Sequence, residues 1–479
     1  MCIGRIIIAG FNGFGRIMKE KKEGQRRISS VQIIVFGFLM VILVGAILLW
    51  LPVSSAERTF TSPVDALFTA TTSVCVTGLT TVTMAAHWSM FGKIVILLLI
   101  QLGGLGVVCA GIGVMIIMKK RITMKERLLI QTAYNLENID GMVRVIKNVS
   151  LGAFAAEGLG AVFYAFVFVP EYGWLKGIWY SIFHSVSAFC NAGIDLLGDS
   201  SLCMYRDNIL INVVTMLLII TGGIGFIVWW DIKKTACHSI RIKKFRGQLF
   251  KRLSVHSKAA IIMTLICIIS GTLLIFLFEF NNPDTIGNLN TGNKLMSSMF
   301  EAVTTRTAGF AAIPQNLFRD TTYIVLLILM LIGGSPMGTA GGIKTTTLAL
   351  IFFSVKSTVK GKKDTEAFGR KISIENIKTA LAVLSIIFAI IFLSIVMLAA
   401  IEPFGLKDIA FETISAMSTS GLTRGITPIL STAGKIIICL VMFAGRIGPI
   451  SLVMAFNIRR KKENMTNMRE LAEARIIIG

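Results

Sequence analysis

Charged residues are scarce in this sequence of 479 residues: they make up 15% of it, while 54% of the residues are hydrophobic. Soluble domains contain roughly 25% charged residues, so the shortage argues against a globular enzyme. Apolar runs of 18 or more residues occur instead, such as Val31–Trp50, Ile209–Trp230 and Leu381–Ile401. Each is long enough to cross a hydrocarbon layer of about 30 Å as a helix. Because the strands of a membrane β-barrel are only about ten residues long, the sequence predicts an all-α integral membrane protein.

Patterns typical of metal sites and disulfide frameworks are also missing. The eight cysteines show no CxxC spacing and the four histidines no HExxH spacing, and Cys109, Cys267 and Cys439 lie within apolar runs, where packing is expected. No cofactor is therefore expected in this chain. A cleavable signal peptide is not expected either, because the first long apolar run begins after about 30 residues and is too long for one.

A glycine-rich stretch near the N-terminus, Ile6–Arg16 (IIIAGFNGFGR), looks like a dinucleotide-binding turn. A Rossmann unit also needs a helix, a second strand and an acidic residue about 20 residues further on, whereas here a basic segment leads straight into an apolar run. We interpret the stretch as a cytoplasmic leader or an appended segment. The alternative is a membrane enzyme that binds a nucleotide there and uses Glu157 or His184. It would need a nucleophile–base pair or a metal cluster, and the sequence displays neither.

Basic residues are abundant but unevenly placed, giving a formal net charge of +22. Of the 48 Lys and Arg residues, 36 fall in five segments, and the loops between them contain nine basic and ten acidic residues. The segments are Met1–Val31, Lys119–Lys147, Asp231–Lys258, Val355–Lys378 and Asn457–Gly479. This alternation follows the positive-inside rule and predicts a multi-pass protein of the cytoplasmic membrane with both termini in the cytoplasm. Membrane lipid is expected as a partner. Nucleic acid is not, because it would require one basic face on a soluble domain.

One short motif occurs four times. Each copy begins with Phe, continues through small and hydroxyl residues, and ends in Gly followed by an apolar residue. The copies are FTATTSVCVTGL ending at Leu79, FHSVSAFCNAGI ending at Ile194, FEAVTTRTAGF ending at Phe310, and FETISAMSTSGL ending at Leu422. The glycines, Gly78, Gly193, Gly309 and Gly421, are separated by 115, 116 and 112 residues. A nearly constant period of this kind indicates internal repeats.

Every copy of the motif has the same surroundings: a long apolar run, a segment of about 10–12 residues that is too short to span a bilayer, the motif, and a second long run. Each repeat therefore reads as helix–pore loop–helix, and four repeats predict about eight transmembrane helices with pseudo-fourfold symmetry around a central pore. The predicted repeats are 32–118, 148–231, 259–354 and 379–456. They are separated by an N-terminal segment 1–31, cytoplasmic loops 119–147, 232–258 and 355–378, and a tail 457–479.

Non-helical backbone within a membrane must be buried in protein or line a polar cavity. Four loops that meet on one axis can stack their carbonyls into rings, as in a potassium filter. Glycine permits the positive φ this requires, and Thr, Ser and Asn side chains can hold each loop by hydrogen bonds. The predicted filter binds K⁺ through backbone carbonyls of Val76, Thr77, Gly78, Asn191, Ala192, Gly193, Thr307, Ala308, Gly309, Thr419, Ser420 and Gly421.

The stretches VCVTGL, FCNAGI, TTRTAGF and STSGL resemble the four filters of the Trk/Ktr/HKT superfamily of cation transporters, and the bacterial KtrB branch in particular. The resemblance extends from about Val31 to the closing IIIG. It implies potassium translocation by a homodimer with a cytoplasmic regulatory ring, in which a nucleotide binds to the partner subunit and not to this chain. It also implies that glycine in all four filters favours potassium. A serine at the position of Gly78 goes with sodium preference in plant relatives.

A second glycine-rich stretch, GGSPMGTAGGIKTTT (Gly333–Thr347), interrupts the second helix of repeat three, because five glycines and a proline cannot hold a regular helix. The resemblance implies that it is an intramembrane gating loop, and we expect it to be non-helical and to lie below the filter. The predicted gate residues are Gly333, Gly334, Ser335, Gly338, Thr339, Gly341, Gly342, Lys344 and Arg446.

Three basic residues remain inside the predicted membrane region: Arg306, Lys344 and Arg446. Intramembrane charge marks function by default. Lys344 is expected to place positive charge on the ion path. Arg446 is expected either to donate to carbonyls of the interrupted segment or to repel ions at the inner side of the pore. Arg306 is expected to pair with Glu301 or Glu412.

The sequence thus predicts a potassium uptake subunit and not an enzyme. Potassium is the expected substrate, and sodium is allowed for as an activator. Two alternatives remain open at this stage, a sodium-coupled potassium symporter and a less selective K/Na transporter. A carrier built on inverted repeats fits less well, because the four repeats run in parallel.

Overall fold

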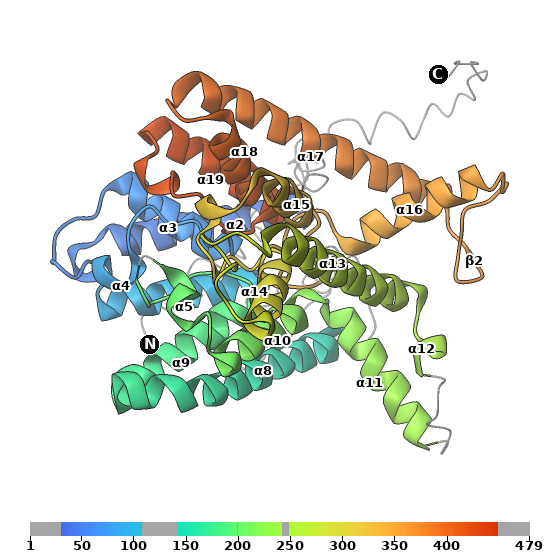
Figure 1. The fold of residues 1–479 in the computed structure, drawn as a ribbon, viewed down its shortest axis with the longest axis horizontal. Helices are drawn as coiled ribbons and strands as arrows, with labels where there is room; N and C mark the ends of the chain where they lie inside the picture. Colours follow the sequence, from blue (N-terminus) through green and yellow to red (C-terminus); the bar gives the residue numbers. More distant parts are fainter. Residues whose placement is uncertain (1–29, 108–141, 199, 242–248, 449–479) are drawn as a thin grey trace, which may run out of the picture.

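The computed structural model describes residues 30–107, 142–198, 200–241 and 249–448, and most of these are helical (Figure 1). Within these ranges the one sheet is a small hairpin of β1 (Glu366–Ala367) and β2 (Arg370–Lys371). The stretch Ile6–Arg16 and the tail 457–479 lie outside the described residues, as does most of the loop 119–147. The predicted all-α fold class is confirmed.

Four long helices open the four repeats. They are α2 (Ser30–Trp50), α8 (Met142–Tyr172), α13 (Val255–Glu279) and α17 (Ile374–Ile401). Each contains an apolar window long enough to span a membrane, yet only 22–28% of that window is buried inside the protein. Exposed side chains such as Phe154 on α8 and Phe392 on α17 are large and apolar. A helix that is apolar on its exposed face needs a lipid environment, so these helices form the outer surface within the membrane.

Four short helices lie between these long helices, and each ends within one of the four motifs. They are α3 (Pro63–Cys75), α9 (Trp174–Phe189), α14 (Thr291–Thr304) and α18 (Leu406–Ser418). The phenylalanine that begins each motif is fully buried in every one: Phe68, Phe183, Phe300 and Phe411. Since these helices are buried and too short to span a bilayer, they are the pore helices that the sequence predicts.

The second helices of the repeats are shorter than the sequence predicts. They are α5 (Met90–Gly104), α10 (Ile209–Gly223), α15 (Asp320–Leu331) and α19 (Thr432–Ile447). The run Ile209–Trp230, predicted as one span, is broken: α11 (Phe226–Arg241) follows α10 at an angle of 92°. The helix that follows α15 is α16 (Thr345–Val359).

A glycine with positive φ lies beyond the end of each second helix. Gly106, Gly225, Gly342 and Gly448 have φ values of 84°, 94°, 63° and 88°. Among the described residues, four helices are long and apolar enough to cross a membrane, and the bent pair α10–α11 would count as a fifth span. The second helices of repeats two and three are thus broken within the described residues, whereas residues 108 onward after α5 and 449 onward after α19 lie outside them.

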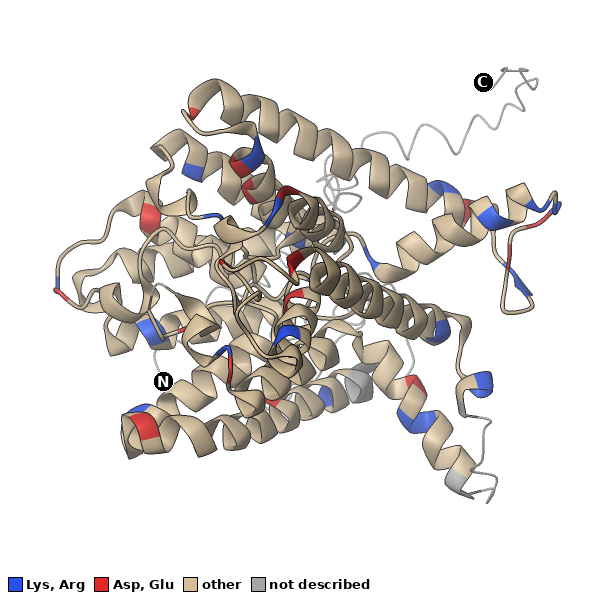
Figure 2. Cartoon of the chain, viewed as in Figure 1, with Lys and Arg blue, Asp and Glu red and all other residues tan. Residues whose placement is uncertain are grey.

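Short elements connect the main helices. They are η1 (Pro52–Ser54), α4 (Met84–His87), η2 (Ser201–Tyr205), α12 (Leu249–Arg252), η3 (Gln315–Leu317) and η4 (Thr427–Ile429). Figure 2 shows that α11, α12 and the hairpin carry Lys and Arg at one end of the molecule, where they project beyond the helical body. This separation of charge from the apolar helices agrees with the segmental distribution of Lys and Arg in the sequence.

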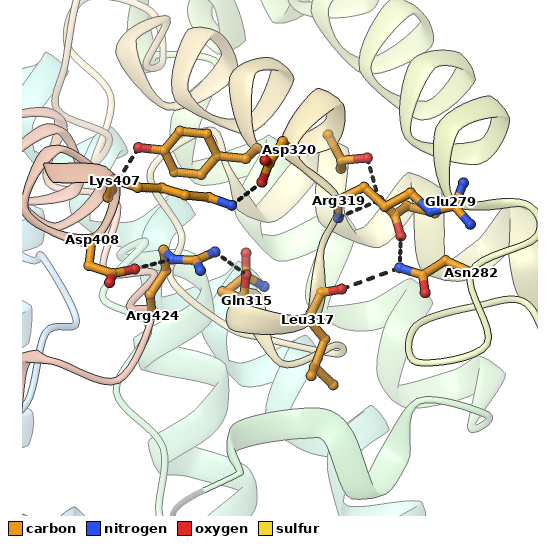
Figure 3. A network of polar contacts seen from close by, with 11 residues as sticks. Glu279, Asn282, Gln315, Leu317, Arg319, Asp320, Lys407, Asp408 and Arg424 are labelled. Atoms are coloured by element: carbon orange, nitrogen blue, oxygen red, sulfur yellow. Dashed lines mark hydrogen bonds and ion pairs between the residues drawn. The ribbon is translucent and has the colours of Figure 1, made fainter. Parts of the chain in front are cut away.

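Repeats three and four are joined by a polar network on the filter side (Figure 3). The carboxylate of Glu279, at the end of α13, accepts hydrogen bonds from Asn282 Nδ2 (2.6 Å), Thr285 Oγ1 (2.7 Å), Arg319 N (3.1 Å) and Thr322 Oγ1. It thereby ties the start of α15 to the end of α13. The ion pair Lys407–Asp320 bridges the two repeats. Arg424 pairs with Asp408 of its own repeat, with Nε–Oδ1 at 2.6 Å, and reaches repeat three by donating from Nη1 to Gln315 O at 3.2 Å.

Candidate ion pathway

The stretches Val76–Gly78, Asn191–Gly193, Thr307–Gly309 and Thr419–Gly421, which we call the filter loops, share one backbone conformation. The first residue of each is left-handed although it is not glycine: φ is 55° at Val76, 58° at Asn191, 71° at Thr307 and 54° at Thr419. The closing glycines also have positive φ, between 61° and 103°. Positive φ at a β-branched residue is rare and costs free energy. Three such residues in four equivalent places indicate a conformation that the surrounding structure imposes.

The four filter glycines meet in a closed ring. A Cβ added at Gly78 would lie 2.6 Å from Ala192 O, and one at Gly193 would lie 2.4 Å from Ala308 O. The contact continues from Gly309 to Ser420 O at 2.8 Å and returns from Gly421 to Thr77 O at 2.0 Å. Each glycine thus faces the carbonyl that precedes the glycine of the next repeat, in chain order and back to the first. Carbonyl oxygens from all four repeats therefore surround one axis, which is the predicted pseudo-fourfold arrangement.

A vestibule with a volume of about 840 Å³ opens onto this ring. All four filter glycines line it, together with polar side chains that include Thr81, Asp195, Gln315 and Arg424. Room of this size admits a hydrated ion to the filter loops from one face of the molecule.

Hydroxyl groups in the last turn of the pore helices hold the filter loops, as expected. Thr72 Oγ1 accepts a hydrogen bond from Gly78 N at 3.0 Å. Ser187 Oγ accepts from Ile194 N at 3.0 Å and donates to Ile194 O at 2.6 Å. Thr304 Oγ1 donates to Phe310 O at 2.6 Å. The expectation fails for Asn191, whose side-chain amide is buried and finds no partner among the described residues.

The predicted gate segment forms a non-helical loop between α15 and α16. Thr345 already begins α16, so this interrupting loop spans Gly333–Lys344 and the predicted end at Thr347 lies three residues too far. The loop closes on itself, because Ile332 pairs with Ile343 in a parallel bridge and Thr345 N donates to Gly334 O at 3.0 Å.

The interrupting loop is docked on the break between α10 and α11 of repeat two. Ser335 N donates to Gly223 O at 2.8 Å and Thr339 N to Gly222 O at 3.1 Å, while Phe226 N donates to Met337 O at 3.0 Å. Thr339 Oγ1 also donates to Phe189 O, at the end of a pore helix, at 3.1 Å. No pattern in the sequence indicates that repeat two receives this loop.

Arg446 reaches the interrupting loop from repeat four, which is the first of its two predicted roles. Its guanidinium donates to Thr339 O and also to Gly103 O and Gly104 O at the end of α5, the last contact at 3.3 Å. Lys344 lies nearby, and its Nζ donates to Ala340 O at 2.7 Å. Both side chains line a small cavity of about 180 Å³ between repeats three and four.

The expected pairing of Arg306 with a carboxylate is wrong. Its Nη2 donates instead to Gly333 O at 3.1 Å and to Thr264 Oγ1 at 3.4 Å. The carboxylates of Glu301 and Glu412 are occupied by N–H and O–H donors of the segments that follow the filter loops. Arg306 therefore joins filter loop three to the first residue of the interrupting loop.

Three glycines of the second helices also belong to the site, although the sequence analysis did not single them out. A Cβ added at Gly103, Gly222 or Gly445 would lie 1.9–2.1 Å from a backbone carbonyl at the end of the pore helix of its own repeat. Such close approach excludes any side chain. The sequence contained a signal for them, since GGLG, GGIG and GRIG follow the filter glycines of repeats one, two and four by 24–29 residues.

The residues of the enzymatic alternative are fully engaged in structural contacts. Glu157 accepts from Gln101 Nε2 at 3.0 and 3.2 Å. His184 Nδ1 lies 2.7 Å from Tyr180 O, and its Nε2 lies 3.4 Å from Leu196 N. Within the described residues no three His, Cys, Asp or Glu side chains are grouped as metal ligands. The Sγ of Cys190 lies 3.9 Å from Glu157 Oε1, but both residues are buried in the protein interior.

The chain is similar to known cation transport proteins over nearly its whole length. A family profile named TrkH and described as "Cation transport protein" matches residues 5–468. The chain is 40% identical to "Potassium/sodium uptake protein NtpJ" of Enterococcus hirae, over 92% of this chain and 96% of the relative. It is also 40% identical to "Ktr system potassium uptake protein B" of Bacillus subtilis, over 95% of this chain and 98% of the relative.

The potassium transporter TrkH from Vibrio parahaemolyticus has a similar solved structure, with a TM-score of 0.71 and 16% identity, covering 91% of this chain and 86% of that one. At that identity the likeness supports the fold alone. The family match covers nearly the whole chain and includes all four filter loops and the interrupting loop. This chain is a multi-pass membrane protein of the TrkH family of cation transport proteins.

Proposed function

We propose that this chain carries potassium into the cell through the ring of filter loops, as the ion-translocating subunit of an uptake system. The observation that carries the proposal is the cyclic contact of Gly78, Gly193, Gly309 and Gly421 with one another's neighbouring carbonyls. A ring of carbonyls can replace the water shell of a dehydrated cation. The names of the two relatives from Enterococcus hirae and Bacillus subtilis support potassium as the ion.

In this proposal potassium is the substrate and binds to the backbone carbonyls of the twelve filter-loop residues. The positive φ values at the first and last residue of each loop support this role, because they turn successive carbonyls toward the same side. No cofactor is assigned to this chain, and sodium is allowed for as an activator.

The interrupting loop is the proposed gate. It lies under the end of pore helix α9, as the contact from Thr339 to Phe189 O indicates, and repeats two and four both hold it. Polar groups such as Ser335 and Thr339 tolerate contact with a watery path. Lys344 adds a positive charge that raises the barrier to a cation.

A second candidate is a transporter that discriminates weakly between potassium and sodium, including one that couples the two ions. Two observations favour it. The filter loops differ in composition, with VTG, NAG, TAG and TSG in the four repeats. One relative also carries both ions in its name.

The proposed orientation places the vestibule outside the cell and both termini in the cytoplasm, since the basic residues of α11, α12 and the hairpin lie at the other end of the molecule. The relative from Bacillus subtilis is named as component B of a Ktr system. By analogy we propose that this chain works as a homodimer in the cytoplasmic membrane with a cytoplasmic nucleotide-binding ring.

Potassium uptake tests the proposal directly. The full chain is expressed in a bacterial strain that lacks its own potassium uptake systems, and growth and rubidium uptake are measured with and without sodium. We expect growth at limiting potassium. Equal uptake with and without sodium would remove the coupled alternative. Failure of rubidium uptake by correctly inserted protein, with and without candidate cytoplasmic partners, would contradict the proposed function.

A further inference from the structure

The residue that follows the pore-helix phenylalanine occupies an equivalent position in the four repeats: Thr69, His184, Glu301 and Glu412. In three repeats its side chain accepts the backbone N–H of the third residue beyond the filter glycine. The contacts are Leu196 N to His184 Nε2 at 3.4 Å, Ala312 N to Glu301 Oε1 at 3.3 Å, and Arg424 N to Glu412 Oε1 at 3.1 Å. One contact thus recurs at one offset, although the side chains differ.

These acceptors are fixed by their other partners. His184 Nδ1 lies 2.7 Å from the carbonyl of Tyr180. Because a carbonyl only accepts, Nδ1 carries the proton and Nε2 is the acceptor in the neutral ring. Glu301 also accepts from Ile313 N and from Gln315 Nε2, while Glu412 also accepts from Thr423 and Thr427 hydroxyls. Both carboxyl groups are buried, and each accepts from three donors.

The first repeat lacks this contact. The side chain of Thr69 is shorter than that of Glu or His and makes no hydrogen bond with the described backbone N–H of Thr81. Its hydroxyl oxygen is buried with no hydrogen-bond partner among the described residues. The hydroxyl of Thr81, the third residue beyond Gly78, is likewise buried and unpartnered in the described part of the chain. Within the ranges that the structure describes, the side-chain contact that holds filter loop one on its pore-helix side is the one from Thr72 Oγ1, beside backbone bonds to Thr72 O and Ser73 O.

We propose that His184, Glu301 and Glu412 are positioning residues that set the selectivity of the filter, and that filter loop one is its most compliant quarter. The inference rests on the proposed function. A loop anchored before and after its carbonyls keeps those oxygens from following a smaller ion inward, so potassium is favoured over sodium. Loss of a second anchor lets the oxygens approach sodium.

The experiment uses the full chain reconstituted in liposomes, with potassium and sodium fluxes measured separately. Glu412→Ala removes the acceptor, and Glu412→Gln retains one. We expect the alanine variant to lower the potassium-to-sodium flux ratio about three- to tenfold, the equivalent of one lost hydrogen bond, and the glutamine variant to restore most of it. His184→Phe removes the acceptor without changing charge, and it retains ring packing against Phe168 and Phe183. It therefore tests the same contact even if Glu412→Ala does not fold.

Glu279→Ala is the matched control, because Glu279 is an equally buried carboxylate whose four donors all lie outside the filter loops. It should lower thermal stability and leave the flux ratio unchanged. A folded His184→Phe or Glu412→Ala protein with the wild-type ratio would overturn the inference, as would an equal loss of ratio in Glu279→Ala. Absence of potassium flux in the wild-type protein would instead count against the proposed function.

Discussion

The filter loops and the helix breaks differ in symmetry. The filter loops repeat one geometry four times, with positive φ at the same positions and the same contact from each repeat to the next. Among the described residues, by contrast, repeat three alone inserts a long loop at its break, and repeats two and four hold that loop. A cage around a spherical ion needs equivalent walls, whereas a gate needs one element that can leave while its neighbours stay in place.

The largest expected effect comes from breaking the ring of filter loops. Gly421→Ala would place a methyl group 2.0 Å from Thr77 O in a rigid backbone contact. Since overpacking of this kind costs about 1–3 kcal/mol or more, we expect potassium flux to fall by at least about tenfold.

Gly425→Ala separates this effect from backbone strain. Gly425 has a φ of 96° and open space where a Cβ would lie. Liposome flux assays should show a much smaller loss for Gly425→Ala. Comparable losses in both variants would mean that positive φ, and not the closed ring, accounts for the effect.

The next effect concerns the seat of the interrupting loop on repeat two. A Cβ added at Gly225 would lie 2.5 Å from Pro336 O. The clash destabilises the closed state by about 1–3 kcal/mol, so Gly225→Ala should displace the loop. We expect potassium flux in the absence of any cytoplasmic partner to rise about tenfold, because the closed state is then less populated.

The chain supplies two matched controls for this experiment. Gly106 and Gly448 also have positive φ beyond the ends of α5 and α19, yet no described residue lies within 4 Å of an added Cβ at either position. If Gly106→Ala and Gly448→Ala raise the unstimulated flux as much as Gly225→Ala, the contact with Pro336 is not what holds the gate.

A smaller increase is expected when the anchor from repeat four is removed. Arg446→Ala deletes the donors to Thr339 O and to Gly103 O and Gly104 O. Hydrogen bonds from a charged group contribute about 1.5–3 kcal/mol, but the contacts to repeat two remain, so unstimulated flux should rise about fivefold. Arg446→Lys retains the charge but loses the several N–H donors of the planar guanidinium. We expect its unstimulated flux to lie between those of the wild-type protein and Arg446→Ala. Unchanged flux in a folded Arg446→Ala protein would limit its role to structure.

The smallest expected effect is on selectivity at the first filter glycine. Gly78→Ser would place its Cβ 2.6 Å from Ala192 O, a milder clash than at Gly421, at a φ of 103°. We expect the ring to distort but to stay open to ions. The potassium-to-sodium flux ratio should fall about threefold, a change of less than about 1 kcal/mol. A ratio equal to that of the wild-type protein would contradict the assignment of Gly78 to the filter.

Much of the architecture could be predicted because its signals are local. The length of an apolar run decides whether a helix can span a membrane, and the spacing from Phe to Gly marks each pore helix and its loop. The broken helix of repeat three was visible in its five glycines and Pro336. The shorter breaks, such as that at Gly225, were missed because a few glycines in an apolar run lower its hydropathy little.

What the sequence by itself determined is therefore the repeat, the membrane class and the positions of the filter loops and the interrupting loop, since each depends on residues close together in the chain. The tertiary structure alone decided which residues meet. It paired Arg306 with Gly333 O and left Glu301 and Glu412 to hold the segments beyond the filter. It also seated the interrupting loop on repeat two, more than 100 residues away. Buried polar groups must find partners within the protein, and several partners were available to each. Only the packing of four repeats around one axis selects among them.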